Sequence, residues 1–493
     1  MEWLSNLGVV GTVIRFVIIL LEVLMVFNLL ILVHEWGHFL AARWCGLKVE
    51  KFYIWFGKPL WKKTINGVEY GLGSIPFGGF VALPQMAPMG GIEGESSPGE
   101  PLPPITPLQK ILVAFAGPLF SFLLAVVFSL LVWQIGMPDQ RIHTTTIGWV
   151  KPGSPGEKAG LKAGDKIIAI DGTPVQSWDE PVDSVKERIA FSKDESIIFT
   201  VQRPGEAKPR DLASKFEIEA GTLFTRKGLR TVGIIWSYDA KVYQVLKGSG
   251  AEQAGIKKGD RITQVNGSPV YTPDAVYEFC EKNPATPAKL EIIRAGKPLA
   301  VTLTPLKPVK PEPMPKEAVS IGLTGITFEN PFSVKEDTTV FQRPGAQLLA
   351  ATTMMKRTFG AVFGSRGDVG IQQMGGPVKI FSVYYMLFTT PDGWKKVLWF
   401  SVVLNVNLAI MNLIPFPVFD GGHIVMALGE MIRRKSLLPL RILEKVQMAC
   451  VILLLCFFSY VTWFDTADLF GTGKKKDKEP DFKVEDIRYS AAK

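Results

Sequence analysis

Histidine and cysteine are both rare in this chain, with four of each among 493 residues. Four cysteines spread this widely do not form the disulfide framework of a small secreted domain, and we interpret Cys45, Cys280, Cys450 and Cys456 as structural thiols. Charged residues make up only 20% of the chain, and the net charge of +9 is modest for its length. The basic residues gather beside apolar segments, which favours contact with anionic lipid headgroups and argues against nucleic acid as a partner.

Apolar residues, by contrast, are abundant at 47% of the chain, and four segments reach the length that spans a lipid bilayer. We expect transmembrane helices within residues 1–46, 110–136, 396–416 and 446–464. The first apolar run is too long for a signal peptide and no small-x-small cleavage site follows it, so we expect it to stay attached. A bacterial inner (cytoplasmic) membrane is the simplest location for such a multi-pass chain.

Basic residues cluster in the loops that follow the first and third spans, and short loops rich in Lys and Arg face the cytoplasm. Residues 47–109 and 417–445 are therefore expected to be cytoplasmic, and both termini and the long middle region to be periplasmic. Lysines within residues 474–478 oppose this orientation, but they lie some distance beyond the last span and acidic residues offset them. The orientation depends on Arg43, Lys48, Lys51, Lys58, Lys62, Lys63, Lys110, Arg433, Arg434, Lys435, Arg441 and Lys445.

Two of the four histidines, His34 and His38, stand four residues apart at the end of the first apolar segment, with Glu35 between them. In a helix, residues four apart share a face, so two imidazoles can face one metal ion while Glu35 projects to the side. A lone histidine is usually a satisfied core residue. This spacing, next to sequence of lipid-spanning length, instead favours a zinc site.

The third span ends in a second polar motif, residues 412–421, which contains Asp420. Pro415 and Pro417 break the helix and glycines follow Asp420, so its carboxylate can turn inward and act as the third ligand of Zn²⁺. His423 competes for this role; we prefer Asp420 because its charge partly neutralises the ion in a medium of low dielectric constant. In the orientation above, the first and third spans run the same way and deliver all three ligands to the cytoplasmic side.

A hydrolytic zinc site leaves one coordination position for water, whose pKa zinc lowers toward about 7. Glu35 would take the proton as this water attacks the scissile carbonyl, and would then pass it to the leaving amine. Asn407 and Asn412 lie in the third span, where polar side chains are costly unless used. They either hydrogen-bond the backbone of an unwound substrate segment or join helices to one another.

Residues 47–109 contain a hairpin signal, Asn66-Gly67, between two runs typical of β-strands. A glycine-rich strand with Gly78, Gly79, Phe80 and Val81 follows, and a flexible loop rich in proline and glycine completes the region. The hairpin either covers the metal helix or binds substrate, because an exposed strand edge pairs with extended backbone and glycines allow a close approach.

The middle region contains an internal repeat: residues 159–165 with 171–175 recur 95 residues later as 254–260 with 266–270. Each copy reads as a short helix, a Gly-Asp turn, a β-branched strand and a second turn, and resembles the α+β PDZ fold in its bacterial form. We place the two PDZ domains at residues 140–235 and 236–308, followed by a periplasmic linker and interfacial helices at 309–395. PDZ modules bind extended peptides, and these two either bind one or only block access.

Taken together, these motifs resemble the site-2 protease family of intramembrane zinc metalloproteases, in the bacterial form with tandem periplasmic PDZ domains. The resemblance implies a polytopic α-helical membrane protein of four transmembrane helices, with a membrane-associated β-hairpin and two PDZ domains. It implies His34, His38 and Asp420 as ligands, Glu35 as base, and Asn407, Asn412 and residues 78–81 as substrate-binding residues. Expected substrates are single-span proteins, such as an anti-sigma factor first trimmed by a periplasmic protease, and remnant signal peptides, with the PDZ pair filtering them in a stress response.

The chain departs from the family pattern in two places. Ser121 stands where the family usually has Asn, and the charged tail, residues 465–493, is longer than the family needs and receives no function from the sequence. Two competing hypotheses are a membrane-anchored PDZ scaffold without catalysis and a zinc peptidase that acts on soluble substrates. The physiological substrate, the organism and the oligomeric state do not follow from the sequence.

Overall fold

The computed structural model describes residues 8–86, 103–139, 141–180, 182–222, 225–309, 316–330, 339–362, 364, 370–390, 392–434, 439–470, 484 and 487–489. Most of the loop expected before the second span, and most of the charged tail, lie outside the described residues. The chain separates into two compact units. Unit 1 consists of Met1–Pro138, Thr339–Lys356 and Met374–Thr466, and unit 2 of Asp139–Thr338, Arg357–Gln373 and Ala467–Lys493.

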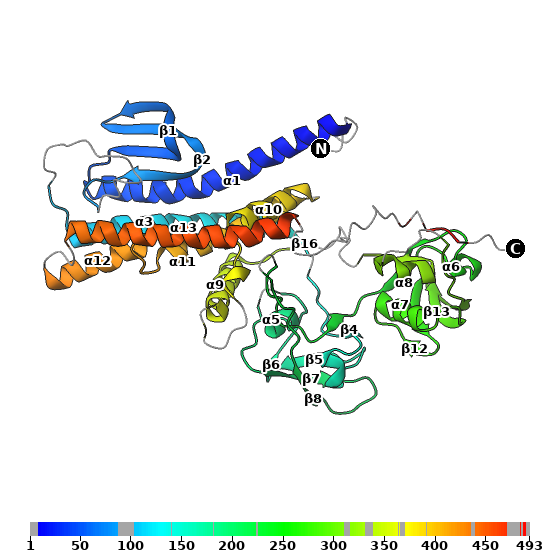
Figure 1. Ribbon diagram of the computed structural model, residues 1–493. Coiled ribbons are helices and arrows are strands. Elements are labelled where there is room, and N and C mark those ends of the chain that lie inside the picture. The colour runs from blue at the N-terminus through cyan, green and yellow to red at the C-terminus, as the bar shows by residue number, and fades with distance from the viewer. Residues whose placement is uncertain are drawn as a thin grey trace. The chain divides into compact units, whose positions relative to one another are not determined.

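In the described part of the chain, four helices of unit 1 are long and apolar enough to cross a membrane. They are α1 (Gly8–Trp44), α3 (Pro107–Ile135), α11 (Gly393–Asn412) and α13 (Leu440–Phe470), and they correspond to the four expected spans, except that the third was expected to run to residue 416 and α11 ends at Asn412. A capping box formed by Thr106 and Gln109 starts α3, because each side chain pairs with the other residue's backbone N–H. α3 packs against α1, α11 and α12 (Asp420–Arg433), so it lies among the helices that carry the site (Figure 1).

The region expected to be a cytoplasmic loop after the third span contains a further helix, α12. α11 ends at Asn412, the chain turns through the two prolines, and Asp420 lies in the first turn of α12. A Cβ on Gly421 would lie 2.3 Å from the Leu413 carbonyl oxygen, and one on Gly422 equally close to that of Phe416. Only glycine permits this close fold-back, which returns Asp420 toward the end of α11.

The hairpin lies beside α1, and its two long strands bend back on themselves to form one sheet (Figure 1). β1 (Lys51–Ile65) and β2 (Val68–Ala82) meet at the Asn66-Gly67 turn, where Ile65 pairs with Val68. Both strands bend, so residues 51–54 pair with residues 69–72 on one side and with residues 79–82 on the other. Residues 79–82 therefore form an outer strand, whose other edge pairs with no strand in the described part of the chain. Trp55 anchors the sheet to α1, since its Nε1 donates to Asn28 Oδ1 at 2.5 Å.

Two further helices follow the repeats: α9 (Pro344–Val362) and α10 (Pro377–Thr389). They occupy the places where the sequence predicts interfacial helices. α10 packs against α11: its Tyr384 is fully buried, and the Tyr384 hydroxyl is hydrogen-bonded to Ser401 Oγ of α11 at 2.9 Å. The short strands β3 (Met137–Pro138) and β16 (Thr339–Val340) pair before α9.

Unit 2 contains both sequence repeats, and their elements follow in the same order, except that the second repeat has one more helix before its last strand. The first repeat comprises β4 (Ile147–Val150), α4 (Pro155–Lys158), β5 (Lys166–Ile170), β6 (Thr173–Pro174), α5 (Val185–Ala190), β7 (Ser196–Gln202), β8 (Arg210–Lys215) and β9 (Ile234–Trp236). The second comprises β10 (Ala240–Val245), α6 (Gly250–Gln253), β11 (Arg261–Val265), β12 (Ser268–Pro269), α7 (Pro273–Lys282), β13 (Ala288–Arg294), β14 (Lys297–Leu303), α8 (Lys316–Thr324) and β15 (Ile326–Phe328).

The aspartate of the repeated Gly-Asp turn is buried in both copies and is held by an arginine. Arg203 donates to Asp165 and to the Gly160 carbonyl, and Arg294 donates to Asp260 and to the equivalent carbonyl of the second copy. A buried carboxylate requires such a partner, because it would otherwise pay the full cost of leaving water. The same contact between an arginine and a buried aspartate is therefore present in both repeats.

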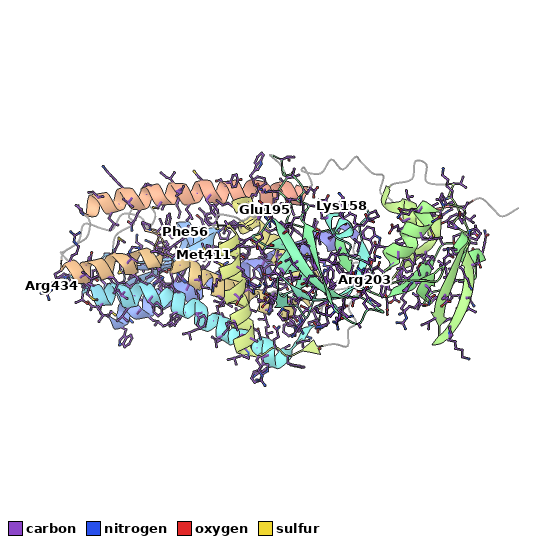
Figure 2. All side chains as sticks on the ribbon, turned by 90° about the horizontal axis from the view of Figure 1, so that it is seen from below. Phe56, Lys158, Glu195, Arg203, Met411 and Arg434 are labelled. Carbon is purple, nitrogen blue, oxygen red and sulfur yellow. The ribbon has the colours of Figure 1, made fainter. Side chains whose placement is uncertain are left out.

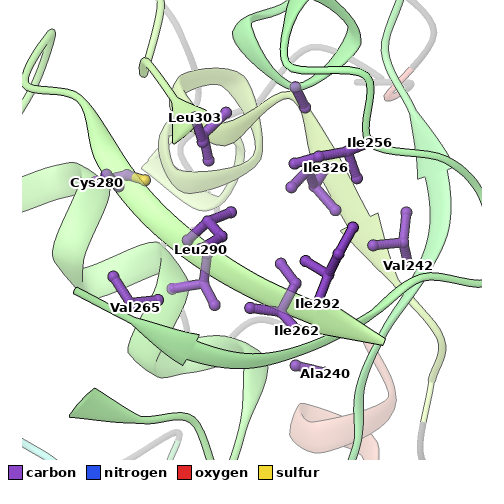
Figure 3. Close-up of a cluster of buried hydrophobic side chains, with 13 residues drawn as sticks. Ala240, Val242, Ile256, Ile262, Val265, Cys280, Leu290, Ile292, Leu303 and Ile326 are labelled. Atoms are coloured by element: carbon purple, nitrogen blue, oxygen red, sulfur yellow. The ribbon is translucent and has the colours of Figure 1, made fainter. Parts of the chain in front are cut away.

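The second repeat has its own apolar core, in which Cys280, Leu290 and Ile292 are fully buried (Figure 3). Burial raises the pKa of the Cys280 thiol to about 12, so this cysteine is unreactive, as expected for a structural thiol. β15 pairs with β10 and contributes Ile326 to the same core. The sheet of this repeat therefore extends beyond residue 308, because a strand that lies later in the chain completes it.

Candidate metal centre

Three potential metal ligands converge in unit 1, two from α1 and one from α12. Nε2 of His34 and Nε2 of His38 lie 3.3 Å apart, and each lies 3.4 Å from a carboxylate oxygen of Asp420. Zinc–ligand bonds of about 2.0–2.1 Å at tetrahedral angles place neighbouring ligand atoms about 3.3–3.4 Å apart. The two imidazole nitrogens and the two oxygens of the Asp420 carboxylate therefore have the chemistry of zinc ligands and lie at the distances that ligands of one zinc ion have.

The far side of each imidazole is held by α3. His34 Nδ1 lies 3.0 Å from Ser121 Oγ, and His38 Nδ1 lies 2.8 Å from the backbone carbonyl oxygen of Val113. A proton on each Nδ1 satisfies these oxygens and leaves each Nε2 unprotonated toward the shared centre. Ser121 thus occupies the place of the family's Asn with a hydroxyl that reaches His34. The Val113 carbonyl has no signature in the sequence, because any residue supplies a backbone oxygen.

Gly117 lies between these two contacts on the same face of α3. A Cβ at this position would lie 2.2 Å from Nε2 of His38. A real Cβ never comes that close to a ring atom, so only glycine allows α3 to pass the imidazole at this distance. Gly37 of α1 is equally constrained, since its Cβ would lie 2.4 Å from the Ala116 carbonyl oxygen. The two glycines bring α1 and α3 together at the site.

Two side chains of α12, Asp420 and His423, are candidates for the third ligand. The carboxylate of Asp420 lies 3.4 Å from Nε2 of each of the two histidines. Burial lowers the pKa of His423, which is neutral; it lines the same pocket but does not belong to the group of converging ligands.

A pocket of about 370 Å³ opens beside the three ligands. Glu35 lines it, and a Cβ added to Gly79 of β2 would lie 3.6 Å from Cγ of Glu35. The outer strand of the hairpin therefore passes directly over the carboxylate. The pocket is lined by Ile31, His34, Glu35, His38, Phe56, Gly79, Phe80, Val81, Leu83, Met86, Val113, Ala114, Leu408, Asn412, Val418, Phe419, Asp420 and His423.

The structure brings most of the expected substrate-binding residues to this pocket. Gly79, Phe80, Val81 and Asn412 line it, and Asn412 Nδ2 lies 3.3 Å from His34 Nε2. Asn407 does not line the pocket; its side-chain oxygen is buried in α11 and has no hydrogen-bond partner in the described part of the chain.

Gly78, also expected to bind substrate, does not line the pocket but lies against Phe56, which does. Its φ angle is +79°, and a Cβ there would collide with the ring of Phe56. Phe56, labelled in Figure 2, lines the pocket and stacks on Phe80 with ring centres 6.1 Å apart. Phe56 could not be predicted as a pocket residue from the sequence. It reaches the pocket only because the bend in β1 folds that strand back on β2.

Comparison with known proteins gives a consistent result over most of the chain. Residues 22–457 match the profile of Peptidase family M50. The regulator of sigma-E protease RseP of Escherichia coli (strain K12) is 31% identical over 432 residues, which cover 82% of this chain and 89% of that protein. Protease RseP of Yersinia pestis is 32% identical over 425 residues, which cover 81% of this chain and 87% of that protein.

Proposed function

The chain belongs to peptidase family M50, the site-2 protease family, and from that membership and the geometry of the site we propose a specific role for each residue of the centre. The protein is an intramembrane zinc metalloprotease, in which we assign His34, His38 and Asp420 as the residues that hold zinc. When bound there, zinc supplies Lewis-acid chemistry, activating water and polarising a peptide carbonyl. The observation that carries the assignment is that the two Nε2 atoms lie 3.3 Å apart and each lies 3.4 Å from an oxygen of the Asp420 carboxylate.

Glu35 is the general base in this proposal. It lies one residue from His34 on α1 and lines the pocket, so its carboxylate faces the same space as the donor atoms. It accepts the proton of the attacking water and then donates it to the nitrogen of the leaving amine, which keeps both proton transfers on one side chain. The surrounding pocket limits the access of bulk water, which strengthens every charge interaction inside it.

We propose that the outer strand of the hairpin binds the substrate backbone. Residues 79–82 pair with β1 on one edge only, so their other edge can accept an extended substrate segment by strand addition. A peptide bond must leave its helix to be cleaved, and the strand edge supplies the hydrogen bonds that the helix loses. Asn412 lines the pocket and offers a further polar contact to that unwound backbone.

The proposed substrates are the transmembrane segments of single-span proteins. Two relatives are named for regulation of sigma-E or as RseP, which supports an anti-sigma factor as one substrate, cleaved after a periplasmic protease has trimmed it. Remnant signal peptides share the same single-span chemistry. The basic loops favour an inner-membrane orientation with the pocket toward the cytoplasm and the repeats and termini in the periplasm. We propose that the two repeats are PDZ domains that filter bulky substrates, either by exclusion or by binding a peptide.

The central test compares Glu35→Gln with Glu22→Gln, the same substitution elsewhere on α1. Glu22 does not line the pocket, which makes it a matched control. Loss of a general base costs about 10²–10⁴-fold, so Glu35→Gln should lower cleavage of a single-span substrate by at least a hundredfold while zinc content stays at the native level. Glu22→Gln should cleave at the native rate. Equal cleavage by native protein and Glu35→Gln would rule out this mechanism.

Two alternatives are separated by the same preparations. A scaffold without catalysis would cleave nothing, with or without bound zinc. A peptidase for soluble substrates would expose its centre to water, and a cysteine placed at Val33 would then react with a membrane-impermeant thiol reagent as fast as a surface cysteine. The intramembrane protease predicts slow labelling at this position.

A further inference from the structure

The end of the charged tail, to which the sequence assigns no function, is docked on the second repeat. Ile487 is only 3% exposed. The carbonyl of Arg488 accepts a hydrogen bond of 2.7 Å from the Val309 N–H, and the hydroxyl of Tyr489 donates one of 2.6 Å to the Gly322 carbonyl. These residues follow well after the last membrane helix, which ends at Phe470. The contacts combine a buried apolar side chain, one backbone–backbone hydrogen bond and one hydrogen bond from a side chain to a backbone carbonyl.

Two glycines form the cradle for Tyr489. A Cβ on Gly248 would lie 3.4 Å from Cβ of Tyr489, and a Cβ on Gly325 would lie 3.4 Å from its hydroxyl oxygen. The first repeat offers an internal comparison, because Gly153 occupies the position equivalent to Gly248. No described residue other than its chain neighbours has an atom within 4 Å of a Cβ built on Gly153. Among the described residues, a tail residue therefore lies beside Gly248 in the second repeat and none lies beside Gly153 in the first.

Residues 487–489 contact two chain segments that meet at the corner where α8 ends and β15 begins. Gly322 belongs to the last turn of α8, and Val309 follows β14. Leu306 N–H donates to the Leu323 carbonyl, and Leu246 N–H donates to the Gly325 carbonyl, so the cradle is part of the packing that places β15. β15 is the outermost strand of its sheet. Contacts at this corner consequently bear on the position of an exposed strand edge.

We propose that residues 487–489 are a built-in strap: the chain's own C-terminal segment occupies a docking site formed by Gly248, Val309, Gly322 and Gly325, and holds the corner between α8 and β15 in place. The tether to α13 keeps the strap at a high effective concentration, so it stays docked even if its intrinsic affinity is modest. The strap also requires the end of the chain to lie on the same side of the membrane as the repeats.

Cross-linking in the full-length chain tests the docking directly. Val309→Cys with Arg488→Cys, treated in membranes with a short bifunctional thiol reagent, should link the tail to the second repeat. A protease site inserted within residues 471–483 reveals the link, because the two fragments stay joined after cleavage. Lys297→Cys with Arg488→Cys is the matched control, since Lys297 lies at the opposite end of β14 from Leu303. Arg488→Cys alone controls for reaction with the four native cysteines.

The strap predicts at least tenfold more linked product from the Val309 pair than from the Lys297 pair. Equal yields would mean that the tail moves freely, and would overturn the proposal. Adding Ile487→Asp to the Val309 pair should reduce the yield at least tenfold, because a carboxylate cannot occupy a site that excludes water. Ile487→Val keeps an apolar anchor and should retain most of the yield. An unchanged yield with Ile487→Asp would also overturn the proposal.

Hydrogen exchange tests what the strap holds. In the full chain with Ile487→Asp, the amides of Leu246 and Val309 should exchange at least tenfold faster than in Ile487→Val, whereas amides of β11 and β13 in the centre of the sheet should be unchanged. Equal exchange at Leu246 and Val309 in the two variants would show that the strap stabilises nothing. Neither measurement depends on proteolysis, so both remain decisive if the proposed function is wrong.

Discussion

Replacing Ser121 by alanine tests whether a hydroxyl on α3 sets the metal affinity of the centre. Ser121 is fully buried, and its Oγ lies 3.0 Å from Nδ1 of His34. Coordination through Nε2 requires the proton on Nδ1, which then donates to this hydroxyl. The substitution removes the acceptor and little else, so the buried N–H of His34 loses its partner and the imidazole loses the contact that fixes its orientation.

Two independent estimates give the size of the effect. Removing the outer partner of a ligating histidine typically lowers metal affinity by about 10- to 100-fold, which corresponds to about 1.4–2.8 kcal/mol. Leaving a buried donor unpaired costs about 1–3 kcal/mol. Because the two ranges agree, we expect the dissociation constant for zinc to rise by about 10- to 100-fold in Ser121→Ala.

Competition against a chromophoric zinc chelator measures this constant on the purified protein. Ser129→Ala is the matched control, because Ser129 is a fully buried serine on the same helix whose Oγ donates to the Val126 carbonyl at 2.8 Å. We expect Ser129→Ala to bind zinc like the native chain. If the two variants bind zinc with the same affinity, the hydroxyl of Ser121 does not support His34 and the proposed role of α3 is wrong.

Three other predictions follow from single contacts. Gly117→Ala places a methyl 2.2 Å from Nε2 of His38 and should lower zinc content and cleavage at least tenfold, whereas Gly345→Ala, whose methyl meets nothing within 4 Å, should leave zinc binding and cleavage unchanged. Gly79→Val should reduce kcat/KM for a single-span substrate without changing zinc content, because the new side chain enters the pocket beside Glu35. Burial alone would raise the pKa of Asp260, but hydrogen bonds from Arg294 and from a backbone N–H lower it below its ordinary value. A depressed carboxyl pKa stabilises the fold above the unfolded pKa of about 3.9, and this stability is lost as the pH falls through the lower folded value. Pepsin should therefore cut the second repeat faster as the pH falls below about 4. The Asp260→Asn variant should be cut readily throughout the tested pH range, so its cleavage rate should depend less on pH. Identical pH profiles for the native chain and this variant would contradict this account.

The parts of the fold that depend on local pattern could be predicted from the sequence. The four apolar segments correspond to long helices, the Asn66-Gly67 turn joins β1 to β2, and the two sequence repeats share one order of elements apart from the additional α8 of the second. In each case the signal is short-ranged: the length of an apolar run, a dipeptide that favours a tight turn, or a repeated spacing. The helix that begins at Asp420 was not expected, because the two prolines before it and the two glycines after Asp420 also fit an irregular loop.

By itself, the sequence determined which groups could ligate zinc, because a helix places residues four apart on one face and only two of its histidines have that spacing. Tertiary structure decided what supports those groups. The hydroxyl of Ser121, the carbonyl of Val113 and Gly117, which lets α3 pass close to His38, all come from α3, some 80 residues away from α1 in the chain. The strap at residues 487–489 and the completion of the second repeat by β15 are likewise contacts between distant segments. Such contacts depend on how whole elements pack, and packing leaves no period or motif in the sequence.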